Sequence, residues 1–192
     1  IAAGGSHSCG IRSGKLYCWG SNSQGQLGNS GNATGNAPYL IGSGTDWLMV
    51  QADSFATCGI RSGGVAYCWG QGTSGELGTG NTQNANSPAL VTGATGWTSI
   101  AVGQSSACGI RGGGLFCWGN NAGNRLAIGA GITTTSTPTQ VGSAVTWTKV
   151  QSSGPHTCGL QGTALYCWGQ GFNGQIGNGG FSTVTTPTQI DA

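Results

Sequence analysis

The sequence predicts an all-β fold, a β-propeller-type repeat array with four blades of about 50 residues, each with a disulfide-linked hairpin. Three observations lead to this prediction. Eight cysteines form four pairs, and the first members of successive pairs lie 49, 50 and 50 residues apart. Cys-Trp-Gly triplets and prolines recur with the same period. Apolar residues lack a 3.6-residue period, and 40 of the 192 residues are glycine, so long helices would be costly.

Two short β-prone runs around a glycine-containing loop recur in every repeat and predict a β-hairpin. If Ser13-Gly14 is a two-residue loop, Cys9 lies opposite Cys18 in a non-hydrogen-bonded pair. The Cα atoms of such a pair are about 4.5 Å apart, at the short end of the range that a disulfide spans. Repeat 2 needs a three-residue loop, 62–64. We therefore expect four disulfides, each within one hairpin: Cys9–Cys18, Cys58–Cys68, Cys108–Cys117 and Cys158–Cys167.

Two more strands complete each predicted unit. One begins at a tryptophan before the hairpin, at 47–51, 97–101 and 147–151, and the other follows a proline, as at 188–190. Four strands make a propeller blade. The repeats are expected at approximately 1–46, 47–96, 97–146 and 147–192, within a single repeat domain.

Composition excludes several classes of protein. Only 5% of the residues are charged, the net charge is +2, and the six cations lie far apart, so nucleic-acid binding is not expected. The longest apolar runs are a handful of residues, so insertion into a membrane is not expected either. The sequence has neither an initiator Met nor a signal peptide, which predicts a mature or trimmed chain.

The segment GGSHSCGIRSGKLYCWGSNSQGQLGNS and its later copies resemble the regulator of chromosome condensation repeat. The resemblance covers the whole chain and rests on the Trp-Gly pair, the period and the Gly-Gln-Leu-Gly equivalents at 25–28, 75–78 and 174–177. It implies blades of a β-propeller, and the disulfides are similar to those of secreted members whose assigned roles are protein binding. Repeat 3 departs, with Gly-Asn-Arg-Leu-Ala at 123–127, so its connecting loop is expected to differ.

The chain has four repeats, whereas propellers of this family usually have seven. Ile1-Ala2-Ala3-Gly4 aligns with 100–103, which places the expected tryptophan three positions before Ile1. Two interpretations follow: a segment of a longer array, or four units that close on themselves or on another copy. Open terminal blades would expose strand edges, so we expect neighbouring blades, in the same longer chain or another copy, to cover them.

Candidate chemical sites are few. Metal sites favour short Cys-x2-Cys clusters, whereas these cysteine pairs have 8 or 9 residues between them, so no metal and no cofactor are expected. His7 and His156 occupy a position that accepts alanine in repeat 2, which favours a packing role. The four acids, Asp46, Asp53, Glu76 and Asp191, are scattered. No catalytic residue is therefore predicted, and the chain is not expected to be an enzyme.

Three arginines and one asparagine are candidate surface sites. Arg12, Arg61 and Arg111 stand at the hairpin tips of repeats 1 to 3, with Gln161 in repeat 4. Because equivalent tips share one face of a propeller, they would form an arc of cations that contacts an anion or an acidic partner. The alternative is that they are solvated turn residues. Asn32-Ala33-Thr34 is an N-glycosylation acceptor sequence.

We interpret the chain as a non-enzymatic extracellular binding or structural scaffold that contacts protein partners or other copies of itself. Rigid blades carry polar loops at 29–37, 79–87, 130–136 and 178–186, which would present a broad contact face. A sharper version is a subunit of an extracellular filament or sheath, because low charge reduces self-repulsion. A lectin-like carbohydrate-binding propeller is an alternative. Small-GTPase exchange is disfavoured, because disulfides do not suit a reducing nucleus.

Overall fold

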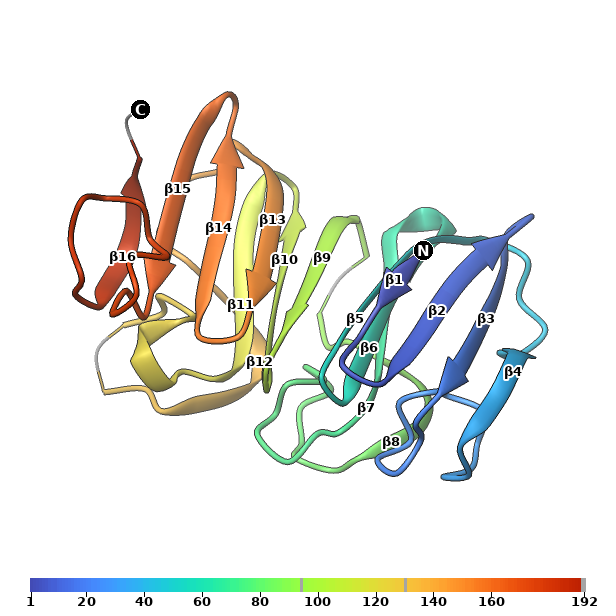
Figure 1. The fold of residues 1–192 in the computed structure, drawn as a ribbon. Coiled ribbons are helices and arrows are strands. Elements are labelled where there is room, and N and C mark those ends of the chain that lie inside the picture. The colour runs from blue at the N-terminus through green and yellow to red at the C-terminus, as the bar shows by residue number, and fades with distance from the viewer. Residues whose placement is uncertain (94, 130, 191–192) are drawn as a thin grey trace.

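The computed structural model describes residues 1–93, 95–129 and 131–190 and contains four four-stranded antiparallel sheets. The sheets lie side by side in chain order, from the blue blade that contains the N-terminus to the red-brown blade that contains the C-terminus (Figure 1). Within the described residues there is no α-helix, only two 3-10 segments, η1 (Ser62–Gly64) and η2 (Ala122–Asn124). These findings confirm the predicted all-β propeller-type fold.

Each blade consists of four consecutive strands. Blade 1 contains β1 (Ala2–Ala3), β2 (His7–Arg12), β3 (Lys15–Gly20) and β4 (Gly35–Leu40). Blade 2 contains β5 (Trp47–Asp53), β6 (Ala56–Arg61), β7 (Val65–Gly70) and β8 (Ala85–Leu90). Blade 3 contains β9 (Trp97–Gly103), β10 (Ser106–Arg111), β11 (Gly114–Asn120) and β12 (Thr134–Gln140). Blade 4 contains β13 (Trp147–Ser153), β14 (His156–Gln161), β15 (Ala164–Gly169) and β16 (Val184–Gln189).

The central hairpin of each blade has the register that the sequence predicts. In blade 1, Arg12 pairs with Lys15 and Cys9 with Cys18, and in blade 2 the three-residue loop is η1. Each hairpin contains one disulfide, with Cα atoms 4.0 to 4.1 Å apart. The bonds are Cys9–Cys18, Cys58–Cys68, Cys108–Cys117 and Cys158–Cys167.

The outer strand of each blade differs from the prediction because it begins before the proline. Pro38 and Pro187 lie inside β4 and β16, three residues after each strand starts. The outer strand is at the edge of its sheet, where a proline that cannot donate a hydrogen bond is tolerated. The pairing register also shifts next to the proline, between Cys18 and Gly20 in blade 1.

Tryptophans dominate the core between the blades. Trp69, Trp118 and Trp168 are fully buried, and Trp47, Trp97 and Trp147 are 3 to 5% exposed. The two sets meet edge to face within each of blades 2, 3 and 4, with ring centroids 5.7 to 5.8 Å apart. Such contacts add to the stabilisation that burial of the rings provides. Both sets of tryptophans therefore lie in the core.

The loop of repeat 3 has different residues but similar backbone conformations. Gly25 and Gly28 have φ values of +84° and +75°, and Asn124 and Ala127 occupy the same positions at +56° and +52°. Leu126 is buried like its equivalent Leu27. The departure in sequence therefore puts two side chains into left-handed conformations that glycine adopts more easily.

Candidate interaction sites

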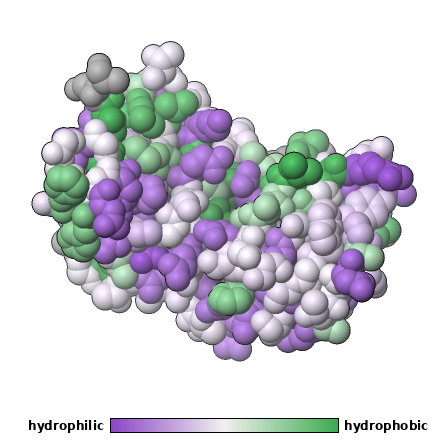
Figure 2. Space-filling model, in the orientation of Figure 1, coloured by the Kyte–Doolittle hydropathy of each residue, from purple (hydrophilic) through white to green (hydrophobic). Residues whose placement is uncertain are grey.

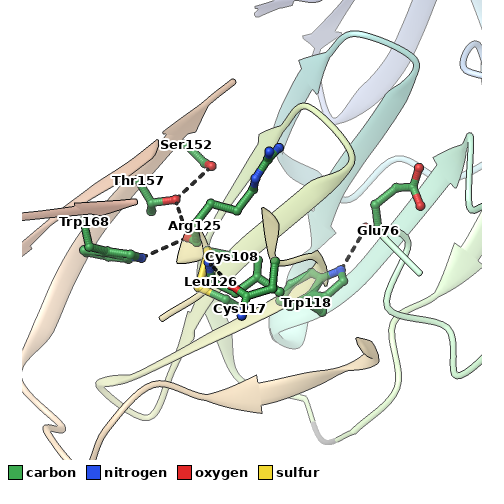
Figure 3. The surroundings of a disulfide bond; sticks show 10 residues. Glu76, Cys108, Cys117, Trp118, Arg125, Leu126, Ser152, Thr157 and Trp168 are labelled. Carbon is green, nitrogen blue, oxygen red and sulfur yellow. Dashed lines mark hydrogen bonds between the residues drawn. A yellow bond between two sulfur atoms is a disulfide. The ribbon is translucent and has the colours of Figure 1, made fainter. Parts of the chain in front are cut away.

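One joint is repeated between successive blades. The indole Nε1 of Trp69 donates to the backbone carbonyl of Gln26 at 3.0 Å. The same bond joins Trp118 to Glu76 and Trp168 to Arg125, each at 2.9 Å, and Figure 3 shows these two joints on either side of the Cys108–Cys117 disulfide. A loop of one blade thus holds the tryptophan of the next blade at each of the three internal joints.

The outward faces of the first and last blades each present half of such a joint. Trp19 is equivalent to Trp69, yet it is only partly buried. Gln175 is equivalent to Gln26 and lies in the loop of blade 4. A groove of about 420 Å³ next to Trp19 is lined by Ile1, Ile11, Tyr17 and Pro38 among others. These apolar side chains are suited to contact with another blade.

The hairpin tips lie beside the start of the next blade. We call this surface the hairpin face: the loops at 13–14, 62–64, 112–113 and 162–163, with the adjoining segments 42–46, 92–93, 95–96 and 142–146. Backbone hydrogen bonds fix the arrangement, for example from Trp47 N to Gly14 O at 3.0 Å and from Trp147 N to Gly113 O at 2.9 Å. The predicted arginines are at the edge of this face.

Arg61 is neutralised by Asp46, the residue that directly precedes blade 2. Its Nε donates to Asp46 Oδ1 at 2.7 Å, Nη2 lies 2.6 Å from the same oxygen, and Ser62 Oγ donates to Oδ2 at 2.9 Å. The hydrogen bond to Arg61 holds the pKa of Asp46 below its usual value. The guanidinium Cζ also lies 5.7 Å from the centroid of the Trp47 ring.

Arg111 has the same aromatic support but no carboxylate. Its Cζ lies 5.0 Å from the Trp97 centroid and 4.5 Å from the Phe116 centroid. Gly96 and Gly112 occupy the positions of Asp46 and Ser62, so the groups that bind Arg61 are missing. In the described part of the chain, the buried Nη1 of Arg111 has no hydrogen-bond partner and Arg111 makes no ion pair.

The other two members of the predicted row differ again. Arg12 is exposed, and Gln161 Oε1 accepts a hydrogen bond from Thr146 Oγ1 at 3.4 Å. The row is therefore not uniform: one arginine is paired, one is solvated, and one is stacked on two rings without an anion. The sequence contains the signal for this difference in Asp46 and Gly96, the residues that directly precede Trp47 and Trp97.

The other candidate residues from the sequence are the two histidines and Asn32. His7 is buried, and its Nε2 lies 2.7 Å from Thr57 Oγ1, which in turn donates to Gln26 O at 2.8 Å. Burial lowers the pKa of His7 to about 4 and also lowers that of His156. Asn32 is exposed, and Asn32 Nδ2 donates to Ser23 O at 3.5 Å. Glycosylation of Asn32 stays a prediction.

The described residues contain no group of three or more His, Cys, Asp or Glu side chains that could hold a metal ion. Asp191 and Ala130, which the sequence analysis included among the acids and the loop residues, lie outside the described residues. No helix in the described ranges has the length and apolar character needed to cross a membrane.

Family models support the resemblance stated from the sequence. One model of the Regulator of chromosome condensation (RCC1) repeat matches residues 63–110, and a second model with the same description matches residues 1–26. These two stretches match the RCC1 repeat. The comparison with curated proteins found no match.

Solved structures extend the likeness to the fold of all four repeats. Human WBSCR16 has a TM-score of 0.88 at 20% identity, over 99% of this chain and 52% of that one. Prp20p of Saccharomyces cerevisiae, whose structure was described with its binding properties to Gsp1p and histones, has a TM-score of 0.88 at 18% identity, over 100% and 50%. The receptor kinase CR4 ectodomain of Physcomitrella patens has a TM-score of 0.52 at 20% identity, and the match covers 88% of this chain and 41% of that ectodomain. The chain spans about half the length of the first two relatives.

Proposed function

We propose that this RCC1-repeat chain is a non-enzymatic, extracellular protein-binding scaffold whose hairpin face takes an acidic protein partner. Arg111 carries the proposal. It is the one arginine of the predicted row that two aromatic rings support and no carboxylate neutralises within the described residues.

Arg61 indicates which ligand suits Arg111. In blade 2 a carboxylate on the Nε and Nη2 side of the guanidinium completes the site. In blade 3 the described residues place no carboxylate against Arg111, and a Cβ built on Gly96, the residue in the position of Asp46, has only Arg111 Cγ within reach, at 4.0 Å. We infer that a carboxylate from a partner's Asp or Glu takes the place that Asp46 has in blade 2 and binds Arg111 through two hydrogen bonds.

The proposed location rests on the disulfides. All eight cysteines are paired, and disulfides persist in oxidising compartments. Blades of paired strands with a disulfide in each also suit a scaffold, since a surface that is already ordered loses little conformational entropy when a partner binds.

The test uses a defined acidic probe, an acetylated and amidated peptide of alternating Asp and Gly. We expect calorimetry to detect binding that Arg111→Gln weakens by at least about tenfold, because hydrogen bonds between charged groups are lost. Lys149→Gln removes the same charge from β13 in blade 4 and should leave affinity unchanged. No binding, or equal losses in both variants, would contradict the proposal.

A filament or sheath is the sharper form of the scaffold, and the half-joints of blades 1 and 4 support it. The Trp19 N–H and the Gln175 carbonyl are equivalent to the groups that pair in each internal joint. A blade of a second copy can therefore form the same joint with each of them, as can a blade of a longer chain. Light scattering should then show mass that rises with concentration, and Trp19→Ala should reduce this rise. A 19 kDa monomer at high concentration would contradict self-association.

A further inference from the structure

A small pocket lies between blades 2 and 3, at the end of the strands opposite the hairpin face. Its volume is about 210 Å³, and its lining includes Ser54, Phe55, Gln71, Glu76, Gln104 and Ser105. Ser54 and Gln104 belong to equivalent turns, between β5 and β6 and between β9 and β10. The pocket therefore lies where the inner turns of two blades meet the loop that contains Glu76.

Glu76 contributes a buried carboxylate to this pocket. Its side chain is 2% exposed, Oε2 accepts a hydrogen bond from Ser74 N at 2.7 Å, and Oε1 is buried with no partner. None of the six Lys and Arg residues, all of which the structure describes, forms an ion pair with it. Ionising a buried acid that has no cation beside it is costly, so the presence of this acid requires an explanation beyond folding.

The equivalent residues show that the fold does not need a charge here. Gln26 and Gln175 occupy the same position in repeats 1 and 4. Their Oε1 atoms accept the corresponding backbone hydrogen bonds, from Gln24 N at 2.9 Å and Asn173 N at 2.8 Å. A neutral amide thus accepts the same backbone hydrogen bond as the carboxylate does. The acid in blade 2 is therefore not required for this turn.

The next joint along the chain contains a cation at the equivalent place. Arg125 replaces Glu76 there, and its Nη1 donates to Gln104 O at 2.8 Å and to Gly154 O at 3.4 Å. Gln104 and Gly154 are the inner-turn residues of blades 3 and 4, as Ser54 and Gln104 are of blades 2 and 3. A guanidinium therefore fits between two inner turns in this fold. Figure 3 shows the extended Arg125 side chain.

We propose that the pocket at Glu76 binds the guanidinium group of an arginine side chain from a partner protein. The carboxylate of Glu76 supplies the counter-charge. The inner turns at Ser54 and Gln104 are equivalent to the two turns that the Arg125 guanidinium contacts in the next joint. The small volume accepts the end of one side chain and excludes a bulky ligand. The site is on the opposite side from the hairpin face and does not depend on binding there.

The test is a titration of the whole chain with methylguanidinium, followed through the backbone amide resonances of Ser54, Gln104 and Ser105. We expect saturable shifts at these amides in the unmodified protein. Glu76→Gln, which reproduces the residue of repeats 1 and 4, should keep the fold and weaken binding by at least about tenfold. Equal binding by both proteins, or no saturable shift, would overturn the proposal.

Two further probes identify the form of the ligand. Tetramethylammonium has the same charge but no N–H donor and should cause no saturable shift. The peptide acetyl-Gly-Arg-Gly-amide should bind at least as tightly as methylguanidinium if the natural ligand is an arginine side chain. Binding of the free ion with exclusion of the peptide would contradict a protein partner.

Discussion

The indole Nε1 of Trp118 donates to the backbone carbonyl of Glu76 at 2.9 Å, and the side chain of the same Glu76 lines the pocket between blades 2 and 3. One residue thus joins two blades through its main chain while its carboxylate stays without a partner on Oε1. The joint and the pocket therefore share one residue. Because the joint uses the main chain of Glu76, a substitution of Trp118 tests the joint without changing the Glu76 carboxylate.

Replacing Trp118 with Phe should destabilise the chain. The change leaves a cavity at a fully buried site and removes the donor to Glu76 O, so we expect a loss of about 2–4 kcal/mol in the free energy of unfolding. Trp19→Phe is the matched control, because Trp19 has the equivalent position but is only partly buried. Similar losses in urea denaturation of the two variants would argue against the joint as a main source of stability.

Ala127→Gly should stabilise the chain by up to about 1 kcal/mol, because Ala127 has a left-handed φ of +52° that glycine adopts more easily. Ala33→Gly is a control at an exposed alanine that is not among the residues with positive φ, and it should not stabilise. Urea midpoints measure both. A destabilised Ala127→Gly variant would show that the methyl group contributes more than the backbone strain costs.

The stability of the chain should decrease in acid because of His7. Its pKa is about 4 in the folded state, below the value of 6.5 that we take for the unfolded chain. The contribution of neutral His7 to the free energy of unfolding is therefore fully present above pH 6.5. It is lost as the pH falls through about 4, by up to roughly 3 kcal/mol. His7→Gln should flatten the change in urea midpoint between pH 7 and pH 4, relative to the unmodified chain.

One control variant, Glu76→Gln, accompanies the His7 experiment. Burial raises the pKa of Glu76, and this effect has the opposite sign, since its contribution is present at low pH and is lost as the pH rises. Glu76→Gln removes that contribution. If His7→Gln leaves the acid sensitivity unchanged in the Glu76→Gln background, another group causes it.

Non-reducing peptide mapping should recover four linked pairs, each within one hairpin. Each bridge is expected to stabilise the chain by about 2–3 kcal/mol, because it restricts a short loop of the unfolded state. A peptide that links Cys18 to Cys58, or eight thiols that react with an alkylating agent, would exclude the observed pairing.

Much of the fold could be predicted because the cysteine pairs, the Cys-Trp-Gly triplets and the glycine-containing loops recur in all four repeats. The loop of two residues at Ser13-Gly14 fixes the pairing of Cys9 with Cys18, and the period extends this to every blade. The extra length of the outer strands could not be predicted, because Pro38 normally argues against a strand and is tolerated only at a sheet edge.

The candidate sites were harder to predict. The sequence placed three arginines at equivalent tips, but their differences depend on neighbours such as Asp46 and Gly96, which act only once the strands pair. Glu76 was seen as one scattered acid. Its importance depends on burial between two blades, and its equivalence to Gln26 and Arg125 is the only signal in the sequence.

The central claim, that an unpaired arginine on the hairpin face takes a partner's carboxylate, is tested most directly by making a second site. Asp46→Ala removes the internal ligand of Arg61 and makes blade 2 resemble blade 3. In a titration with the Asp-Gly peptide, the Arg61 Nε–H resonance should not respond in the unmodified chain but should shift and saturate in Asp46→Ala, as Arg111 does in both proteins. An unresponsive Arg61 in Asp46→Ala, or an unresponsive Arg111 in the unmodified chain, would contradict the account.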